Sequence, residues 1–177
     1  MSGTEEEVGG EPVDEIAKIA GPIGGLWVAY NDHGIAGASF ANLKTFARFR
    51  EEHHDRTGRP SARAEAMPDD LFDAIERSFN TGDRGALTFD LRGGTPFQIA
   101  VWEACLAIPA GKTRTYADLA TAIHRPNAVR AVGTALGANP IPVLIPCHRV
   151  VRTDGSLGDY AFGLPIKERL LDREAVR

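Results

Sequence analysis

Residues 141–150 read IPVLIPCHRV, an apolar run that ends in the adjacent pair Cys147 and His148. A thiolate is a strong nucleophile, and a neighbouring imidazole can keep it deprotonated near neutral pH. The apolar run is typical of a buried strand. Since adjacent side chains on a strand point to opposite faces, the two residues can cooperate only if the chain turns here or a water bridges them. Buried cysteines are common and mostly inert, so this stretch alone leaves a catalytic and a structural thiol equally open.

A boundary and a helix precede this stretch. Gly93-Gly94-Thr95-Pro96 separates two halves of the chain. Thr95 as N-cap and Pro96 as the first helical residue predict a helix through about Ala107. Cys105 falls on the apolar face of that helix, which favours packing in the core over a reactive role.

Residues 115–138 are typical of a helix-turn-helix. Thr115, followed three residues later by Asp118, resembles a capping box at the start of a short helix that ends near Ile123. The turn is expected at residues 124–126, before the second helix.

That second helix is predicted over residues 128–138, with Asn127 as its cap. Most of its residues are small, and its glycines lower the helix propensity. Close helix packing explains so many small residues. A face slim enough to enter a nucleic-acid groove, with Arg130 as its long cationic projection, explains them equally well. The residues alone leave both interpretations open.

The first half of the chain reads as a small α/β unit. A strong turn signal, Asn31-Asp32-His33-Gly34, lies between two apolar runs and predicts a hairpin. The expected elements are strands over residues 25–30 and 35–40, helices over 43–52 and 69–79, and a third strand over 86–91.

Composition excludes several classes of protein. Cys105 and Cys147 are the two cysteines, too few for a disulfide framework or a cysteine-rich zinc site, which suits a reducing cytoplasm. No apolar stretch approaches the length of a membrane span. His53 and His54 lack further ligands nearby, so no metal is expected. The acidic, glycine-rich start is unlike a signal peptide, and residues 1–15 are expected to form a disordered leader.

The net charge of −4 is unevenly distributed. Residues 1–91 hold 9 Lys and Arg against 17 Asp and Glu, whereas residues 92–177 hold 11 against 7. A basic half is what a phosphate-binding surface requires. Uneven surface charge without a partner is the alternative.

A longer pattern surrounds the Cys-His pair. From Thr95 to Glu174 the chain reads TPFQ…VW…IPAGKTRTYADLA…RPNAVRAVG…NPIPVLIPCHRVV…DGSLGDY…GLPIKERLLDRE. This half closely resembles the O6-alkylguanine-DNA alkyltransferases, also called methylated-DNA–protein-cysteine methyltransferases. The resemblance implies an α/β protein with two domains. An N-terminal ribonuclease-H-like three-stranded domain (residues 16–92) precedes a C-terminal winged-helix-like domain with a helix-turn-helix (residues 93–177), which holds the site.

The resemblance implies catalytic roles for four residues. Cys147 resembles the acceptor that takes the alkyl group by in-line displacement, and His148 the residue that activates the thiol through a water. Glu174 resembles the carboxylate that orients this histidine. Asn139 resembles the hinge residue that braces the turn around the cysteine. An exposed carboxylate and a helix C-terminal asparagine are the respective alternatives.

DNA contacts follow from the same resemblance. The target atom lies inside a stacked duplex, so the base must be turned out into a pocket. Arg130 resembles the arginine that fills the vacated space, and Tyr116 the aromatic residue that crowds the flipped nucleotide's phosphate. Arg125 and Thr153 match positions that touch backbone phosphates in relatives.

The guanine pocket is expected to include Tyr160, Ala161 and Phe162. Many relatives carry Gly in place of Phe162 and often Ser in place of Ala161. A phenyl ring at this position is expected to admit a methyl group and to exclude a benzyl group. The zinc ligands of some relatives are absent from the first half.

The implied function is DNA repair by direct damage reversal. The alkyl group of O6-alkylguanine, with O4-methylthymine as a further candidate, moves irreversibly and stoichiometrically to the protein's own cysteine. No cofactor is required, because the substrate brings the alkyl group and guanine is the leaving group. The expected partner is double-stranded DNA, and the protein is expected to be a cytoplasmic monomer.

Two alternatives come from other classes of protein. A non-enzymatic alkyl-lesion sensor of the same fold would bind damaged DNA without transfer, but such proteins usually lack the cysteine. A Cys-His hydrolase would need an oxyanion hole and would not explain Arg130.

Overall fold

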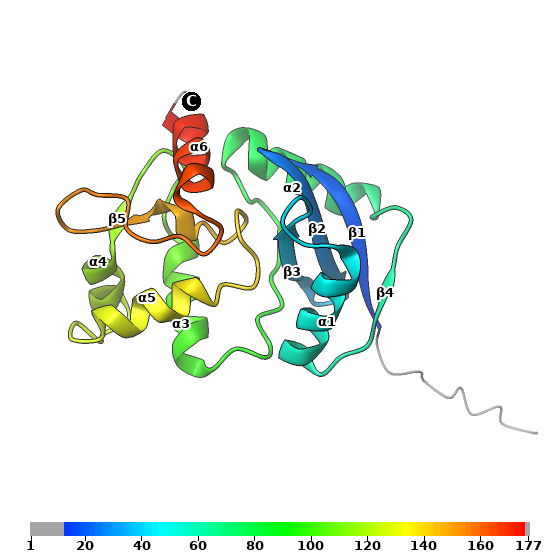
Figure 1. Cartoon of the computed structure of the whole chain (residues 1–177), viewed down its shortest axis with the longest axis horizontal. Helices are drawn as coiled ribbons and strands as arrows, with labels where there is room; N and C mark the ends of the chain where they lie inside the picture. The colour runs from blue at the N-terminus through cyan, green and yellow to red at the C-terminus, as the bar shows by residue number, and fades with distance from the viewer. Residues whose placement is uncertain (1–12, 176–177) are drawn as a thin grey trace, which may run out of the picture.

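A computed structural model describes residues 13–175, which form two lobes side by side (Figure 1). The elements of the first lobe are β1 (Asp14–Gly21), β2 (Gly24–Asn31), β3 (Gly34–Phe40), α1 (Phe46–Thr57), β4 (Ser61–Arg63) and α2 (Asp69–Thr81). Those of the second are α3 (Pro96–Leu106), β5 (Arg114–Thr115), α4 (Tyr116–Ala122), α5 (Val129–Gly137), the 3₁₀ turn η1 (Cys147–Arg149), β6 (Val150–Val151) and α6 (Leu164–Ala175).

The first lobe is built on one sheet with the strand order β3-β2-β1-β4. The predicted hairpin is confirmed, since β2 and β3 pair antiparallel up to the Asn31–Gly34 pair. The sheet has four strands rather than the expected three, because β4 pairs in parallel with β1. The strand expected over residues 86–91 is wrong, because this segment makes only an isolated bridge from Phe89 to Ile35 at the sheet edge.

The true third strand is β1, which begins inside the segment expected to be a leader. Most of that segment, residues 1–12, lies outside the described residues. Asp14 and Glu15 belong to the sheet, where Glu15 pairs with Tyr30, so the leader prediction is wrong for these two residues. The side chain of Asp14 is buried against His53 and Arg59, which fixes the start of the strand.

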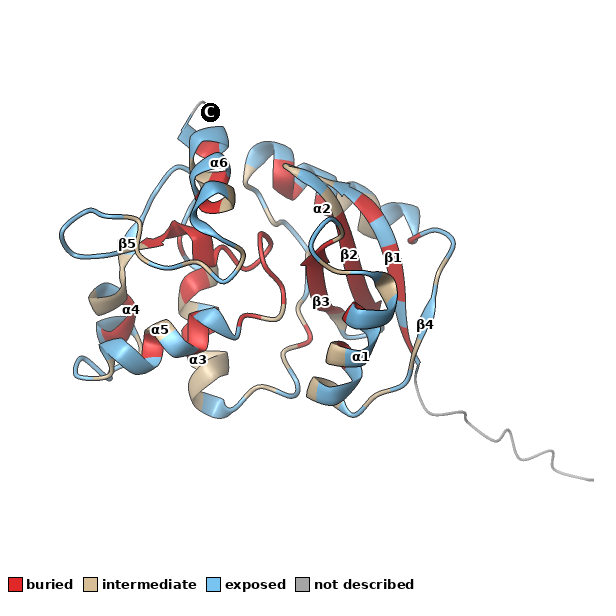
Figure 2. Cartoon of the chain, in the orientation of Figure 1, coloured by how far each residue is buried: buried red, intermediate tan, exposed pale blue. Residues whose placement is uncertain are grey.

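Helices cover both faces of the sheet. Ile16, Trp27 and Phe49 form a small core under α1 on one face. On the other face, α2 contributes to a larger core that continues into the second lobe. Buried segments occur in both lobes (Figure 2), and one hydrophobic cluster includes residues of both. The division into domains at residues 92 and 93 therefore stays a prediction.

Capping residues set the helix starts. Helix α1 begins at Phe46 rather than near residue 43, because the hydroxyl of Thr45 accepts from the backbone N–H of Arg48. The predicted start of α3 after Thr95 is confirmed, and Gln98 completes a capping box there. The capping box of Thr115 and Asp118 is confirmed at the start of α4.

Helix α5 has the predicted position with a different cap. Its N-cap is Ala128 and no side chain caps it, so the capping role expected for Asn127 is wrong. Trp102 on α3 donates its indole N–H to the carbonyl of Ala135, which fixes α5 against α3. Cys105 is fully buried on α3, as predicted. No helix within residues 13–175 is long and apolar enough to cross a membrane.

Candidate active site

The stretch before Cys147 is a tight buried turn, not a strand. Pro142 and Ile145 form a single bridge, and Val143 between them has a φ of 72°, a conformation that is strained for a β-branched residue. The strand prediction is therefore wrong here. The chain then enters η1, so Cys147 and His148 lie on a turn, which satisfies the condition that the sequence set for their cooperation.

Asn139 holds this turn together with three hydrogen bonds. Its Nδ2 donates to the carbonyl of Ile145 (2.9 Å) and to Sγ of Cys147 (3.0 Å), and its Oδ1 accepts from the N–H of Ile141 (2.9 Å). The next residue is held from the first lobe, because the N–H of Ala38 on β3 donates to the carbonyl of Pro140 (2.8 Å). Both lobes therefore position the cysteine.

His148 is held by a carboxylate from the last helix. Its Nε2 donates to Oε1 of Glu174 at 2.8 Å, and both side chains are buried. The interpretation of Glu174 as an exposed carboxylate is wrong. Arg149 binds the same carboxylate with two N–H groups, at 2.8 and 2.9 Å, and donates a third to the carbonyl of Ile108. This bidentate geometry fixes the carboxylate plane.

The positive charge of Arg149 balances the negative charge of Glu174 beside His148. Burial alone would raise the pKa of Glu174, but hydrogen bonds from His148 and Arg149 outweigh it and lower this pKa to about 2. Burial lowers the pKa of His148 despite the nearby carboxylate, so the imidazole is neutral at rest. Its Nδ1 makes no hydrogen bond within residues 13–175 and is available to accept a proton. Burial also raises the pKa of the Cys147 thiol.

A cavity of about 490 Å³ opens beside Cys147. Four more of the predicted site residues line it, namely Tyr116, Arg130, Tyr160 and Ala161. Small residues of α5, Gly133 and Gly137, form part of its wall, so the glycines of this helix open space at the site.

Tyr116 lies at the start of α4, where it packs against the loop that contains Gly158 and Asp159. Its hydroxyl donates to the carbonyl of Asp159 at 3.4 Å. Gly158, with a φ of 70°, leaves room for the ring, because a Cβ built there would lie 2.9 Å from the Tyr116 hydroxyl oxygen. The loop that carries Tyr160 is thereby fitted to α4.

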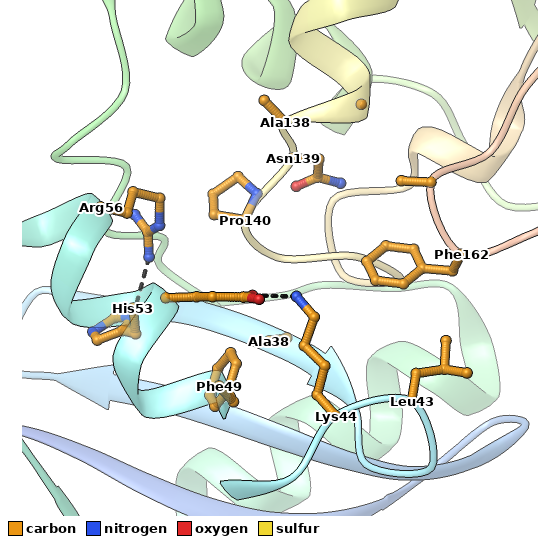
Figure 3. A pocket seen from close by; sticks show the side chains of 13 residues that line it. Ala38, Leu43, Lys44, Phe49, His53, Arg56, Ala138, Asn139, Pro140 and Phe162 are labelled. Atoms are coloured by element: carbon orange, nitrogen blue, oxygen red, sulfur yellow. Dashed lines mark hydrogen bonds and ion pairs between the residues drawn. The ribbon is translucent and has the colours of Figure 1, made fainter. Parts of the chain in front are cut away.

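Of the residues predicted to contact DNA or guanine, three lie outside this cavity. Arg125 and Thr153 are exposed and do not line it. Phe162 lines a second cavity of about 400 Å³ between the lobes (Figure 3), opposite His53 and Lys44. Its ring packs against the rings of Phe40 and Tyr160, and its place beside the alkyl group stays a prediction.

Sequence reasoning missed several residues of the site. Arg149, which follows His148 in the chain, has no predicted role, although it holds Glu174. Lys167 on α6 is fully buried and had no assigned role, and Arg152 lines the cavity. The spacing of Lys167, Leu170 and Glu174 places Lys167 on the same helical face as an apolar residue, which is the one signal in the sequence for this lysine. Within residues 13–175 no cluster of His, Cys, Asp and Glu could hold a metal ion.

Comparisons with known proteins identify similar chains. Residues 96–176 match the family described as "6-O-methylguanine DNA methyltransferase, DNA binding domain". The chain is 39% identical over 163 residues to the methylated-DNA–protein-cysteine methyltransferase of Salmonella typhimurium, which covers 89% of this chain and 93% of the relative. Its match to the inducible methyltransferase of Bacillus subtilis is 53% identical over 81 residues, 46% of this chain and 45% of that relative. The chain thus spans about half the length of this second relative.

Solved structures are similar over nearly the whole chain. The OGT of Mycobacterium tuberculosis, solved in complex with DNA, matches with a TM-score of 0.75 and 33% identity over 92% of this chain and 93% of that one.

Proposed function

The chain belongs to the family of methylated-DNA–protein-cysteine methyltransferases, and on that premise we propose that it repairs O6-alkylguanine in DNA by moving the alkyl group to Cys147. The observation that carries this proposal is the position of Sγ. It lies at a cavity and accepts a hydrogen bond from Nδ2 of Asn139. The next residue is the neutral His148, whose Nε2 is held by Glu174. A thiol in this setting can act as a nucleophile once its proton leaves.

The proton has an acceptor in His148. Its Nδ1 takes the thiol proton, with a water as the carrier, and the resulting imidazolium is stabilised by Glu174. Sγ then forms a bond to the alkyl carbon while the bond from that carbon to O6 breaks. The guanine leaves with the electron pair and takes up the proton that the thiol released. The thioether product has no route back, so each protein molecule reacts once.

DNA is proposed to bind over α4 and α5. Arg130 is exposed on α5 at the rim of the cavity, and the second half of the chain is basic. In this proposal Arg130 fills the space left by the flipped base, and Tyr116 crowds the phosphate of the flipped nucleotide. Arg125 and Thr153 are exposed and available to backbone phosphates. The preference for duplex DNA, the monomeric state and the cytoplasmic location remain predictions.

The range of alkyl groups is proposed to depend on Phe162. The cavity of Cys147 and the cavity between the lobes share Gly137 and Ala161 as lining residues. A methyl group fits beside Sγ without reaching Phe162. A benzyl group must extend past Ala161, toward the ring of Phe162, so it is expected to react slowly.

Incubation with duplex DNA that carries O6-[methyl-³H]methylguanine tests the proposed function. We expect one equivalent of label on the protein, and none on a Cys147→Ser variant that still binds the lesion. Cys105→Ser, which changes the other buried cysteine, serves as the matched control and should accept label normally. Binding without transfer by the unchanged protein would favour a lesion sensor, and neither binding nor transfer would favour a hydrolase.

A further inference from the structure

Lys167 is a buried cation with unusual partners. Its side chain on α6 is fully buried. Its Nζ donates to the backbone carbonyls of Val150 (2.6 Å), Leu157 and Asp159 (3.4 Å). No carboxylate among residues 13–175 forms an ion pair with it. Burial of a charge without an ion pair is costly, so a buried lysine at this position indicates that its charge has a specific role.

The three acceptors belong to the walls of the active site. Val150 directly follows the turn η1 that carries Cys147. Asp159 lines the cavity of Cys147 and precedes Tyr160, which lines it as well. The ammonium group therefore lies behind the cavity wall, where it joins β6, α6 and the loop at residues 157–161.

Several of the other charged groups around the thiol are paired or neutral. Glu174 is paired with Arg149, and His148 is neutral because burial lowers its pKa. Asp159, at the rim, lies 3.5 Å from Arg152. The remaining titratable neighbours, which are neutral at pH 7, are Cys105 on α3, Tyr116 on α4 and Tyr160 in the loop. Two further cations without an ion pair in the described structure are Arg130, exposed at the rim of the cavity, and Arg84, half-buried near Cys105. Lys167 is the fully buried cation without a carboxylate partner.

We propose that Lys167 is a positioning residue whose buried charge, held behind the cavity wall by three backbone carbonyls, stabilises the thiolate of Cys147. This proposal rests on the proposed function of Cys147 as the nucleophile. The electrostatic directions agree with it. Burial raises the pKa of Cys147, whereas the hydrogen bond from Asn139 and the charge of Lys167 lower it. In turn, burial lowers the pKa of Lys167, and Cys147 raises it.

The test separates charge from packing with a pair of variants. Lys167→Gln keeps N–H donors for the carbonyls and removes the charge, whereas Lys167→Arg keeps the charge. Lys112→Gln changes an exposed lysine in the same lobe and is the matched control. The rate of Cys147 alkylation by iodoacetamide is measured from pH 5 to 10, with the modified peptide identified by mass spectrometry. Iodoacetamide needs neither DNA nor guanine recognition.

We expect Lys167→Gln to react about tenfold more slowly at pH 7, to reach the same rate at high pH, and so to shift its profile to higher pH. Lys167→Arg and Lys112→Gln should keep the original profile. A uniform loss of rate at every pH, with no shift, would overturn the proposal, because lost packing has that effect. Absence of methyl transfer from DNA with this shift intact would instead contradict the proposed function alone.

A second measurement covers the case in which Lys167→Gln does not fold. Coupling between two sites is reciprocal, so a thiolate stabilised by Lys167 must also favour the charged ammonium. NMR titration of the Lys167 side chain in the unchanged protein and in Cys147→Ser is therefore expected to show a lower lysine pKa in the variant. Equal lysine pKa values in the two proteins would overturn the proposal.

Discussion

Replacement of Asn139 by alanine is expected to loosen the turn and weaken the nucleophile together. The variant loses all three side-chain bonds of Asn139. The N–H of Ile141, a fully buried residue, then has no acceptor, which costs about 2 kcal/mol. The lost bond to Ile145 costs about 1 kcal/mol, since that carbonyl still accepts from the N–H of Cys147.

These losses add up to about 3 kcal/mol in the free energy of unfolding, which lowers the Tm of a chain of this size by about 9 °C. The thiol is also affected, because the N–H of Asn139 helps to lower the pKa of Cys147. Without it, the rate of methyl transfer at pH 7 should fall and recover partly at higher pH.

Calorimetry and a single-turnover methyl-transfer assay check both effects. Asn127→Ala is the control, because Asn127 is exposed and caps no helix, and it should change stability by less than about 0.5 kcal/mol. A Tm of Asn139→Ala within 2 °C of the unchanged protein, or an unchanged transfer rate, would refute this account of the turn.

Three further predictions concern transfer from duplex DNA, stability at low pH and the size of the transferred alkyl group. Arg130→Ala should slow methyl transfer from duplex far more than transfer from the free base, and equal slowing in a stopped-flow comparison would point to a damaged fold. Because the pKa of Glu174 is lowered from 4.5 to about 2, its ionised form stabilises the folded state; this stability is complete above about pH 4.5 and is lost as the pH falls toward 2. Urea titrations should show a loss on the order of 3 kcal/mol across that window, absent in Glu174→Gln. Phe162→Gly should raise the rate with O6-benzylguanine more than the rate of methyl transfer, and fast benzyl transfer by the unchanged protein would contradict the proposed barrier.

Local signals in the sequence predicted the elements that local contacts determine. The hairpin follows from a turn signal, and α3 and α4 begin where Thr95 and Thr115 cap them. Strand β1 starts within an acidic stretch, and its first residue, Asp14, is buried only because His53 and Arg59 reach it from distant positions. No local pattern carries that information.

In the site too, local signals were predictable and contacts between distant residues were not. The motif around Cys147 and the family resemblance named several residues that lie around the thiol, such as Asn139, Tyr116 and Tyr160. They did not give the conformation of residues 141–145, because an apolar, β-branched run favours a strand until the side chain of Asn139 bonds the turn. Arg149 binds Glu174, which lies far away in the sequence, and Lys167 binds backbone carbonyls. Contacts of these two kinds cannot be recognised from a local sequence pattern.

Peptide mass spectrometry after reaction with duplex O6-methylguanine DNA tests the central claim most directly. One methyl group is expected on the peptide that contains Cys147, in one equivalent per protein, with guanine restored in the DNA. A methyl group on Cys105, or an unmodified protein beside repaired DNA, would contradict the assignment of Cys147 as the acceptor.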